Sequence, residues 1–463
     1  MRNNRFNDAP LKLLSEGEGS ALIAVLVVTM ILSVLITSIL MGFLIQSRLI
    51  DRDHDRLQAR YSAEAGIYHF LADSASSVIP QRDSLAVTLE DSSQVNLQLK
   101  PFGGYLLVSS TARVHNQTTT ILAMVGEDTL SECNKAIVLG DVHSALTMAG
   151  TSKINGDILV GPLGTKQSEF KGELFKGEVD GSIKKDSVSP MPDYHTLFFK
   201  NELARDDSLI SHAPKTVQAI DSDELDLTSG LPFKSHQVWY REGDLMLSSM
   251  KSTELPEFLT IVVTGDLTVK GGIHVGRFNR CLAGKSMTLT DSVGGEQALF
   301  YAKDSLKLGN NVRIGGQFIA QKKITIRNQS YLKYPTVLYL GGYTGQNTYK
   351  GTINIMDNSK VNGTVILPKT SETVTRDSTR ITIGKDAIVR GTIYNSGKTE
   401  LTGTVLGSVM TFQFYLYRSP TTYINWLLDS QIDQKKRPNP YILPLGFSKE
   451  KHYKLVTWQE GGL

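Results

Sequence analysis

Apolar residues form one unbroken run near the start of this chain of 463 residues. No side chain in residues 20–45 carries a charge, and the run exceeds the roughly 20 residues that an α-helix needs to cross a ~30 Å hydrocarbon core. Main-chain polar groups in lipid must bond within their own segment, so a single span has to be helical. The apolar core of a secretory signal peptide is shorter, about 7–15 residues. The pattern predicts a transmembrane helix over residues 20–47, after a polar leader over residues 1–19.

After the span, acidic and basic residues alternate and no proline or glycine pair interrupts residues 20–72. We expect the same helix to continue into water over residues 48–79. Its first 50 residues would make a rod of about 75 Å at ~1.5 Å per residue. Positions near helical spacing in the second half are Leu49, Arg56, Tyr61, Ala65, Tyr68 and Leu71.

Four short runs then alternate apolar and polar residues, namely SLAVTLE, QVNLQLK, YLLVSSTARVH and TTTILAMVG. Turn-forming residues such as Gly103-Gly104 and Asn116-Gln117 separate them. This period-two alternation predicts an antiparallel β-meander over residues 80–130, packed on the water-exposed half of the helix.

A 15-residue repeat follows, with gap-free copies at residues 146–160, 306–320, 353–367 and 381–395. Each copy has apolar residues at positions 1, 3, 9 and 13 and a turn-rich interval at positions 4–7. Residues from Ile324 onward start another copy, which Pro335 is expected to break. The glycine at position 11 is Gly156, Gly316, Gly363 or Gly391, and a partial copy contains Gly403.

Short strands separated by glycine and asparagine corners are typical of stacked β-coils, in which only stacking joins the thin apolar rows into a core. Glycine suits a corner where another backbone comes close. We therefore predict a right-handed parallel β-helix over residues 131–412, with an insertion around residues 161–257. The fold class is mainly β, with one long N-terminal helix and a small antiparallel sheet.

Residues 413–463 are the most aromatic part of the chain, with Tyr415, Tyr417, Tyr423, Trp426 and Tyr441. Residues 424–433 could form one short helix, and Pro438, Pro440 and Pro444 exclude a longer one. A solenoid needs its last coil covered, so we interpret this segment as a C-terminal cap. A partner-binding surface is the alternative, since aromatic residues are enriched at interfaces.

Composition and charge narrow the classes of function that the chain could have. The net charge of +3 is close to balance, and no basic patch with interleaved aromatic residues predicts nucleic-acid binding. Cys133 and Cys281 do not have metal-binding spacing. We expect both to be small buried residues, and a long-range disulfide outside the cytoplasm stays open.

No catalytic motif stands out. The nine histidines show no metal-ligand spacing, and neither a Gly-x-Ser-x-Gly elbow nor a phosphate-binding loop is present. We therefore expect no enzyme activity, no cofactor and no metal. The enzymatic alternative is a β-helix polysaccharide lyase or hydrolase, which would need neighbouring carboxylates. Its candidates are Asp291, Asp304, Asp357 and Asp386, of which the last two occupy turn positions of the repeat.

The N-terminal region resembles PilX-type minor pilins, within the type IV pilin and type II secretion pseudopilin class. The resemblance covers residues 12–72 and is carried by the Gly19–Ser20 junction, the apolar helix and a short motif, Ala63-Glu64-Ala65-Gly66. It implies that a prepilin peptidase cuts after Gly19 and leaves Ser20 as the new N-terminus. Major pilins carry Glu where this chain has Ala24, which argues against a major subunit. An ordinary signal anchor is the alternative.

The resemblance implies a structural or adhesive subunit of a type IV pilus or secretion-type filament, in the bacterial inner membrane with the β-helix outside the cytoplasm. Its partners would be the lipid bilayer, other pilin-like subunits through the helix, the prepilin peptidase, and a cell-envelope polysaccharide or another surface ligand. The repeat also resembles bactofilins, which implies the alternative of a membrane-anchored scaffold polymerising through its β-helix.

Charge bias does not settle the topology. Three basic residues precede the span and four follow closely, which leans slightly against a cytoplasmic N-terminus. They are Arg2, Arg5 and Lys12 before it, and Arg48, Arg52, Arg56 and Arg60 after it.

Overall fold

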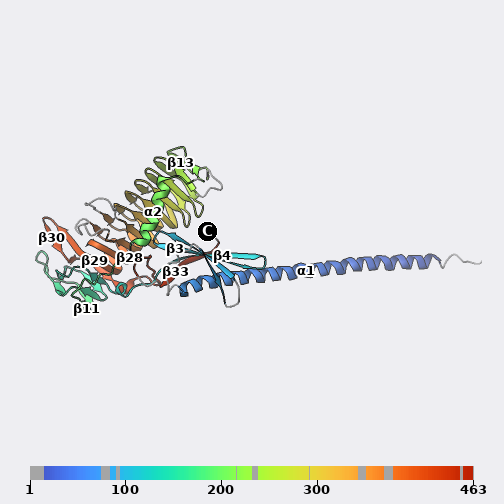
Figure 1. Ribbon diagram of the computed structural model, residues 1–463, viewed down its shortest axis with the longest axis horizontal. Coiled ribbons are helices and arrows are strands. Elements are labelled where there is room, and N and C mark those ends of the chain that lie inside the picture. Colours follow the sequence, from blue (N-terminus) through green and yellow to red (C-terminus); the bar gives the residue numbers. More distant parts are fainter. Residues whose placement is uncertain are drawn as a thin grey trace, which may run out of the picture.

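One long helix, α1 (Ser15–Asp73), projects from a β-rich body (Figure 1). The computed structural model describes residues 15–73, 84–89, 94–214, 216–231, 238–290, 292–341, 351–369, 379–448 and 452–461. The body consists of a five-stranded antiparallel sheet and a large stack of parallel strands. The predicted fold class, mainly β with a long N-terminal helix, a small sheet and a β-helix, is confirmed.

The two halves of α1 have different surroundings. Side chains from Ala21 to His54 are exposed, whereas small and apolar residues farther along are buried against the sheet. The buried positions recur every three or four residues, as one face of a helix requires. They are Ala59, Ser62, Ala63, Gly66, Ile67 and Phe70.

The antiparallel sheet has the order β1 (Ser84–Thr88), β2 (Gln94–Phe102), β3 (Tyr105–Val114), β4 (Gln117–Glu127) and β33 (Tyr453–Glu460). Alternate residues of its strands pack on opposite faces. Leu106 and Val108 pack toward α1, while Leu107 packs toward the stack. The sheet is therefore buried on both faces. The edge strand β33 lies in the segment expected to form only a C-terminal cap, so this part of the expectation is corrected.

The main part of the stack contains parallel strands that pair in three ladders around one apolar interior. The described residues between 306 and 405 form successive rungs, as the repeat predicts. In chain order the strands are β12 (Gln218–Ala219), β13 (Glu224–Asp226), β14 (Val238–Arg241), β15 (Leu245–Glu254), β16 (Thr260–Val263), β17 (Leu267–Val275), β18 (Arg280–Ala283), β19 (Met287–Leu289), β20 (Gly294–Ala302), β21 (Ser305–Leu308), β22 (Arg313–Ala320), β23 (Lys323–Ile326), β24 (Tyr331–Leu340), β25 (Thr352–Ile355), β26 (Lys360–Leu367), β27 (Arg380–Ile383), β28 (Ile388–Leu401) and β29 (Thr404–Arg418).

The first coil in sequence does not stand at the beginning of the stack. Strand β5 (Ile137–Leu139) pairs with β29, so the coils of residues 137–185 continue the stack beyond its C-terminal rung. The strands of this end are β6 (Leu146–Ala149), β7 (Lys153–Asn155), β8 (Ile158–Val160), β9 (Thr165–Gln167), β10 (Glu178–Asp180), β11 (Ile183–Lys185), β30 (Thr421–Ile424), β31 (Trp426–Leu428) and β32 (Gln431–Asp433).

One rung is shared between two distant parts of the chain. Both β5 and β32 stack on β29, and the coil after β5 stacks on both of them. The chain reaches β5 from β4 and leaves β32 toward β33, and β4 and β33 are paired neighbours in the sheet. The β-helix is therefore a head inserted between two adjacent strands of the smaller domain.

Glu127, at the end of β4, binds the segment that leads from β32 to β33. Its main chain exchanges two hydrogen bonds with Leu443, of 2.8 and 2.9 Å. Its buried carboxylate accepts hydrogen bonds from the main-chain N–H groups of Gly446, Phe447 and Ser448 at 2.8–3.0 Å. Several donors to one buried carboxylate compensate its lost hydration.

Three further expectations need correction. Residues 218–254 are rungs of the stack, so the expected insertion at 161–257 is reduced to the excursion between β11 and β12, which contains α2 (Leu197–Ser211). Residues 424–433 contain β31 and β32 instead of a helix. The copy that Pro335 was expected to break forms a full rung, because a register shift between Leu332 and Thr336 absorbs the extra residues.

Helix α2 lies across the rungs (Figure 1) and is held there by a buried ionic cluster. Arg280 on β18 contacts Glu202 at 3.2 Å and also Asp206, and all three residues are buried. Burial raises the pKa of both carboxyl groups, and the neighbouring guanidinium opposes that rise. Removing one partner of such a cluster leaves an uncompensated buried charge.

The repeat glycines form a column at the corner between two ladders. Gly391 lies opposite Gly363, and Gly407 lies opposite Gly391. A Cβ atom on Gly316, Gly363 or Gly391 would come within 1.9–2.3 Å of a carbonyl oxygen of the preceding rung. The corner therefore excludes any side chain, which is the physical reason for glycine at position 11.

Two other repeat glycines occupy related places. Gly156 has a φ of +127°, and its Cβ would lie 2.9 Å from Gln434, beside the shared rung. Gly403 precedes β29, and a Cβ there would lie 2.4 Å from the carbonyl oxygen of Ala387. Both positions therefore also require glycine, because a Cβ atom would overlap its neighbours.

Adjacent glycines in β22 provide a test of the corner. We expect Gly316→Ala to destabilise the head by about 2 kcal/mol, because the new methyl group overlaps the Ala298 carbonyl oxygen. Gly315→Ala is the matched control, since its nearest contact would be 3.3 Å, to the Lys333 Cβ atom. Urea unfolding of both variants measures the difference, and equal stabilities would contradict the role given to the corner.

Candidate functional site on the long helix

The N-terminal half of α1 presents apolar side chains on all sides. Within the described part of the chain, this helix is long and apolar enough to cross a membrane, with a window of mean hydropathy 2.8 that has no buried residue. Leu26, Ile36 and Phe43 are each at least 50% exposed. A continuous apolar surface of this size marks contact with lipid or with other proteins.

The Gly19–Ser20 junction lies inside helical backbone, because α1 begins at Ser15. The helix therefore starts within the segment that the sequence assigns to a leader. Residues 1–14 lie outside the described part of the chain.

The Ala63–Gly66 motif lies where α1 docks on the sheet. Ala63 is fully buried, and its carbonyl oxygen accepts a hydrogen bond of 2.7 Å from the Ser110 hydroxyl of β3. A Cβ atom on Gly66 would lie 2.6 Å from Val95 of β2. Glu64 and Ala65 are half-buried at the edge of this contact. Small residues thus let the helix backbone approach the strands closely.

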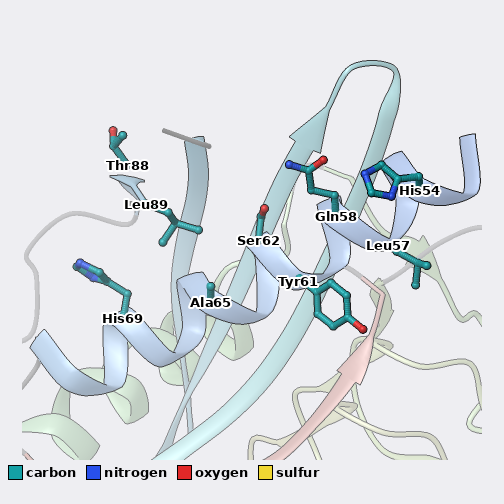
Figure 2. A pocket seen from close by; sticks show the side chains of 9 residues that line it. All are labelled: His54, Leu57, Gln58, Tyr61, Ser62, Ala65, His69, Thr88 and Leu89. Atoms are coloured by element: carbon teal, nitrogen blue, oxygen red, sulfur yellow. The ribbon is translucent and has the colours of Figure 1, made fainter. Parts of the chain in front are cut away.

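A groove of 720 Å³ runs along this half of the helix, between α1 and the end of β1 (Figure 2). Leu57 and Tyr61 project from one side of α1, and Gln58 and Ser62 from the other. Leu57, Tyr61 and Tyr68 are 50–65% exposed. Their spacing of four and seven residues places them on one face. The groove is lined by His54, Leu57, Gln58, Tyr61, Ser62, Ala65, His69, Thr88 and Leu89.

Of the carboxylates considered for catalysis, one is paired and two lie in turns. Asp304 forms an ion pair with Lys322. Asp357 and Asp386 are exposed in turns, and Asp386 has a φ of +57°. Asp291 lies outside the described residues. Other corner aspartates join rungs, as Asp266 does by accepting a 2.8 Å hydrogen bond from the Ser286 main chain.

Cys133 and Cys281 are free and buried, as expected, and burial raises the pKa of both thiols to about 12. Among the described residues, no group of three His, Cys, Asp or Glu side chains is placed to hold a metal ion.

Comparisons with known proteins do not identify a family for this chain. No protein-family model matches the sequence, and no curated protein matches it. Among solved structures, the chain is similar to the competence-associated pilin ComZ from Thermus thermophilus, with 11% identity over 88% of this chain and 97% of that one. The TM-score is 0.22, which does not indicate a common overall fold.

The close approach at the motif can be tested with two helix glycines. Gly66→Ala should destabilise the docked half of α1 by about 2 kcal/mol, because the methyl group overlaps Val95 and Ser110. Gly42→Ala has nothing within 4 Å and is the control. Hydrogen exchange of residues 59–70 in the full chain reports the loss, and unchanged protection in the Gly66 variant would contradict it.

Proposed function

We propose that this protein is a pilin-like subunit, anchored in the bacterial inner membrane by α1, that carries a β-helix head outside the cytoplasm. The observation that supports this most is the division of α1 into an exposed apolar half and a half docked on a small antiparallel sheet. The Ala63–Gly66 motif lies at that docking site, where the pilin resemblance of the sequence has its most specific residues.

Energetics support an anchor. Leaving an apolar side chain in water costs roughly 1.5–3 kcal/mol relative to burial. The long run of exposed residues from Leu22 to Ile50 thus needs an apolar environment far larger than the body supplies. Lipid provides it before assembly, and other helices of the same kind would provide it within a filament.

The exposed face of residues 57, 61 and 68 continues this surface beyond the span. It combines one leucine and two tyrosines. Tyrosine has an apolar ring and a polar hydroxyl, so it suits a surface that is exposed to water before assembly and buried by another subunit afterwards. We assign it to contact with a neighbouring pilin-like subunit. The head would meet a cell-envelope polysaccharide or another surface ligand.

The scaffold alternative is less well supported. End-to-end polymerisation would use the outermost strands of the stack, β11 and β13. These carry exposed charged residues, including Lys184, Lys185 and Glu224. Charges on an edge strand oppose pairing with another chain.

Processing provides the first test. In cells that possess a prepilin peptidase, the mature chain should begin at Ser20, as read by mass spectrometry of its N-terminal peptide. Gly19→Val should leave residues 1–19 attached, because the branched side chain replaces the residue before the cut. Gly17→Val is the control and should be processed normally. A wild-type chain that keeps Met1 would argue for the anchored scaffold.

Assembly provides the second test. Leu57→Glu combined with Tyr61→Glu should strongly reduce the amount of protein recovered in sheared surface filaments, since two charges would enter an apolar contact. Tyr417→Glu, on a side chain 46% exposed at the opposite end of the molecule, is the control. Immunoblots of filament and membrane fractions separate failed assembly from failed expression. Normal incorporation of the double variant would exclude this face.

A further inference from the structure

A second groove lies just after the apolar span of α1, where the helix meets the end of the sheet formed by the start of β4 and the end of β33. It has a volume of 600 Å³, and a smaller groove of 330 Å³ continues it along the helix. The last residues of β33 and the first residues of β4 form its far wall. It is lined by Leu49, Arg52, Asp53, Arg56, Gln117, Thr118, Thr119, Thr120, Glu460 and Gly461.

The groove is at the height of lipid headgroups, if α1 spans the bilayer as proposed. The exposed apolar stretch of α1 ends at Ile50, and Arg52 and Arg56 follow it by about 3 Å and about 9 Å at ~1.5 Å per residue. The headgroup layer is about 5–8 Å deep, and helical side chains lean toward the N-terminus. Leu49 and Ile50 are exposed by 54% and 61% and extend the apolar surface to the groove.

The charges of the larger groove are balanced, and its smaller continuation adds the guanidinium of Arg60. Arg52 and Arg56 provide two guanidinium groups, and Asp53 and Glu460 provide two carboxylates. Arg56 and Glu460 approach each other only to 3.7 Å, with side chains 68% and 43% exposed. Such a surface pair contributes little to stability, so a ligand can separate it at low cost. Within the larger groove, a singly charged anion would meet as many repelling groups as attracting ones.

We propose that this groove binds the zwitterionic headgroup of a phosphatidylethanolamine lipid. Its phosphate accepts hydrogen bonds from Arg52 and Arg56, a pairing that guanidinium geometry favours. Its primary ammonium donates to Asp53 and Glu460, and the exposed hydroxyl of Thr118 lies on the same wall. The glycerol and acyl chains continue along Leu49 toward the span.

The same chemistry ranks the competing lipids. Phosphatidylcholine offers the phosphate, but its quaternary ammonium has no N–H to donate to the carboxylates. Phosphatidylglycerol offers a phosphate and two hydroxyl donors but no cation, so it leaves the negative charges of Asp53 and Glu460 uncompensated. The site therefore discriminates by the ammonium as well as by the phosphate.

Lipid retention tests this proposal, which rests on the proposed membrane anchor. The full chain is reconstituted in vesicles with equal amounts of phosphatidylethanolamine, phosphatidylcholine and phosphatidylglycerol, extracted gently, and examined by native mass spectrometry. We expect about ten bound phosphatidylethanolamine molecules for each bound phosphatidylcholine or phosphatidylglycerol, a preference of roughly 1.4 kcal/mol. Flotation of the same vesicles shows separately whether the protein is anchored, so failed anchoring and failed recognition are distinguishable.

Two double variants separate the charges. Asp53→Asn with Glu460→Gln should abolish the preference for phosphatidylethanolamine over phosphatidylcholine. Arg52→Gln with Arg56→Gln should reduce retention of all three lipids. Arg380→Gln with Glu400→Gln is the control, because it removes a surface ion pair of 3.4 Å on β27 and β28 of the head.

Three results would overturn the proposal. The first is a retained lipid mixture equal to the bulk mixture in a protein that floats with the vesicles. The second is enrichment of phosphatidylglycerol, or binding of inorganic phosphate alone, either of which would indicate an anion site. The third is an unchanged preference after the carboxylates are neutralised.

Discussion

The buried carboxylate of Glu127 holds together the junction on which the molecule depends. It fixes the connection that returns from the head to β33, and β33 then pairs with β4, the strand from which the head departs. The head can share a rung between β32 and β5 only if its two ends are held close together. The sheet, in turn, can be buried on both faces only if the head is held against it.

The repeat made much of the β-helix predictable from the sequence, because its information is local. Glycine at position 11 reflects a corner where the preceding rung leaves no room, and Gly363 and Gly391 obey that rule directly. The order of the coils was not predictable. The copy at residues 146–160 has the shape of any rung, and nothing in its own residues determines that it stacks beyond residues 404–433. Residues 218–254 lack the clear repeat but still form rungs, since ladder hydrogen bonds are made by the backbone.

The candidate sites were also predictable only in part, because some of their features are local in the sequence and others depend on the tertiary structure. The helix was predicted from its long apolar run, and the motif at Ala63–Gly66 was singled out by the resemblance to PilX-type pilins. Which strands they meet, Val95 and Ser110 included, depends on the sheet. The groove beside Arg52 was not predicted, because Glu460 reaches it only through the return of β33. Aromatic composition suggested a cap for the C-terminal residues, and composition does not reveal a distant pairing partner.

An inserted head also determines how mechanical load would pass through the molecule. A pull on the far end of the stack reaches the sheet through two covalent connections, and these enter neighbouring strands that run antiparallel. Tension arriving along β4 and β33 is thus divided between them before it reaches α1. A head attached through a single linker would instead concentrate the whole force on one peptide segment. Two connections that enter paired strands therefore share a pulling force that a single linker would bear alone.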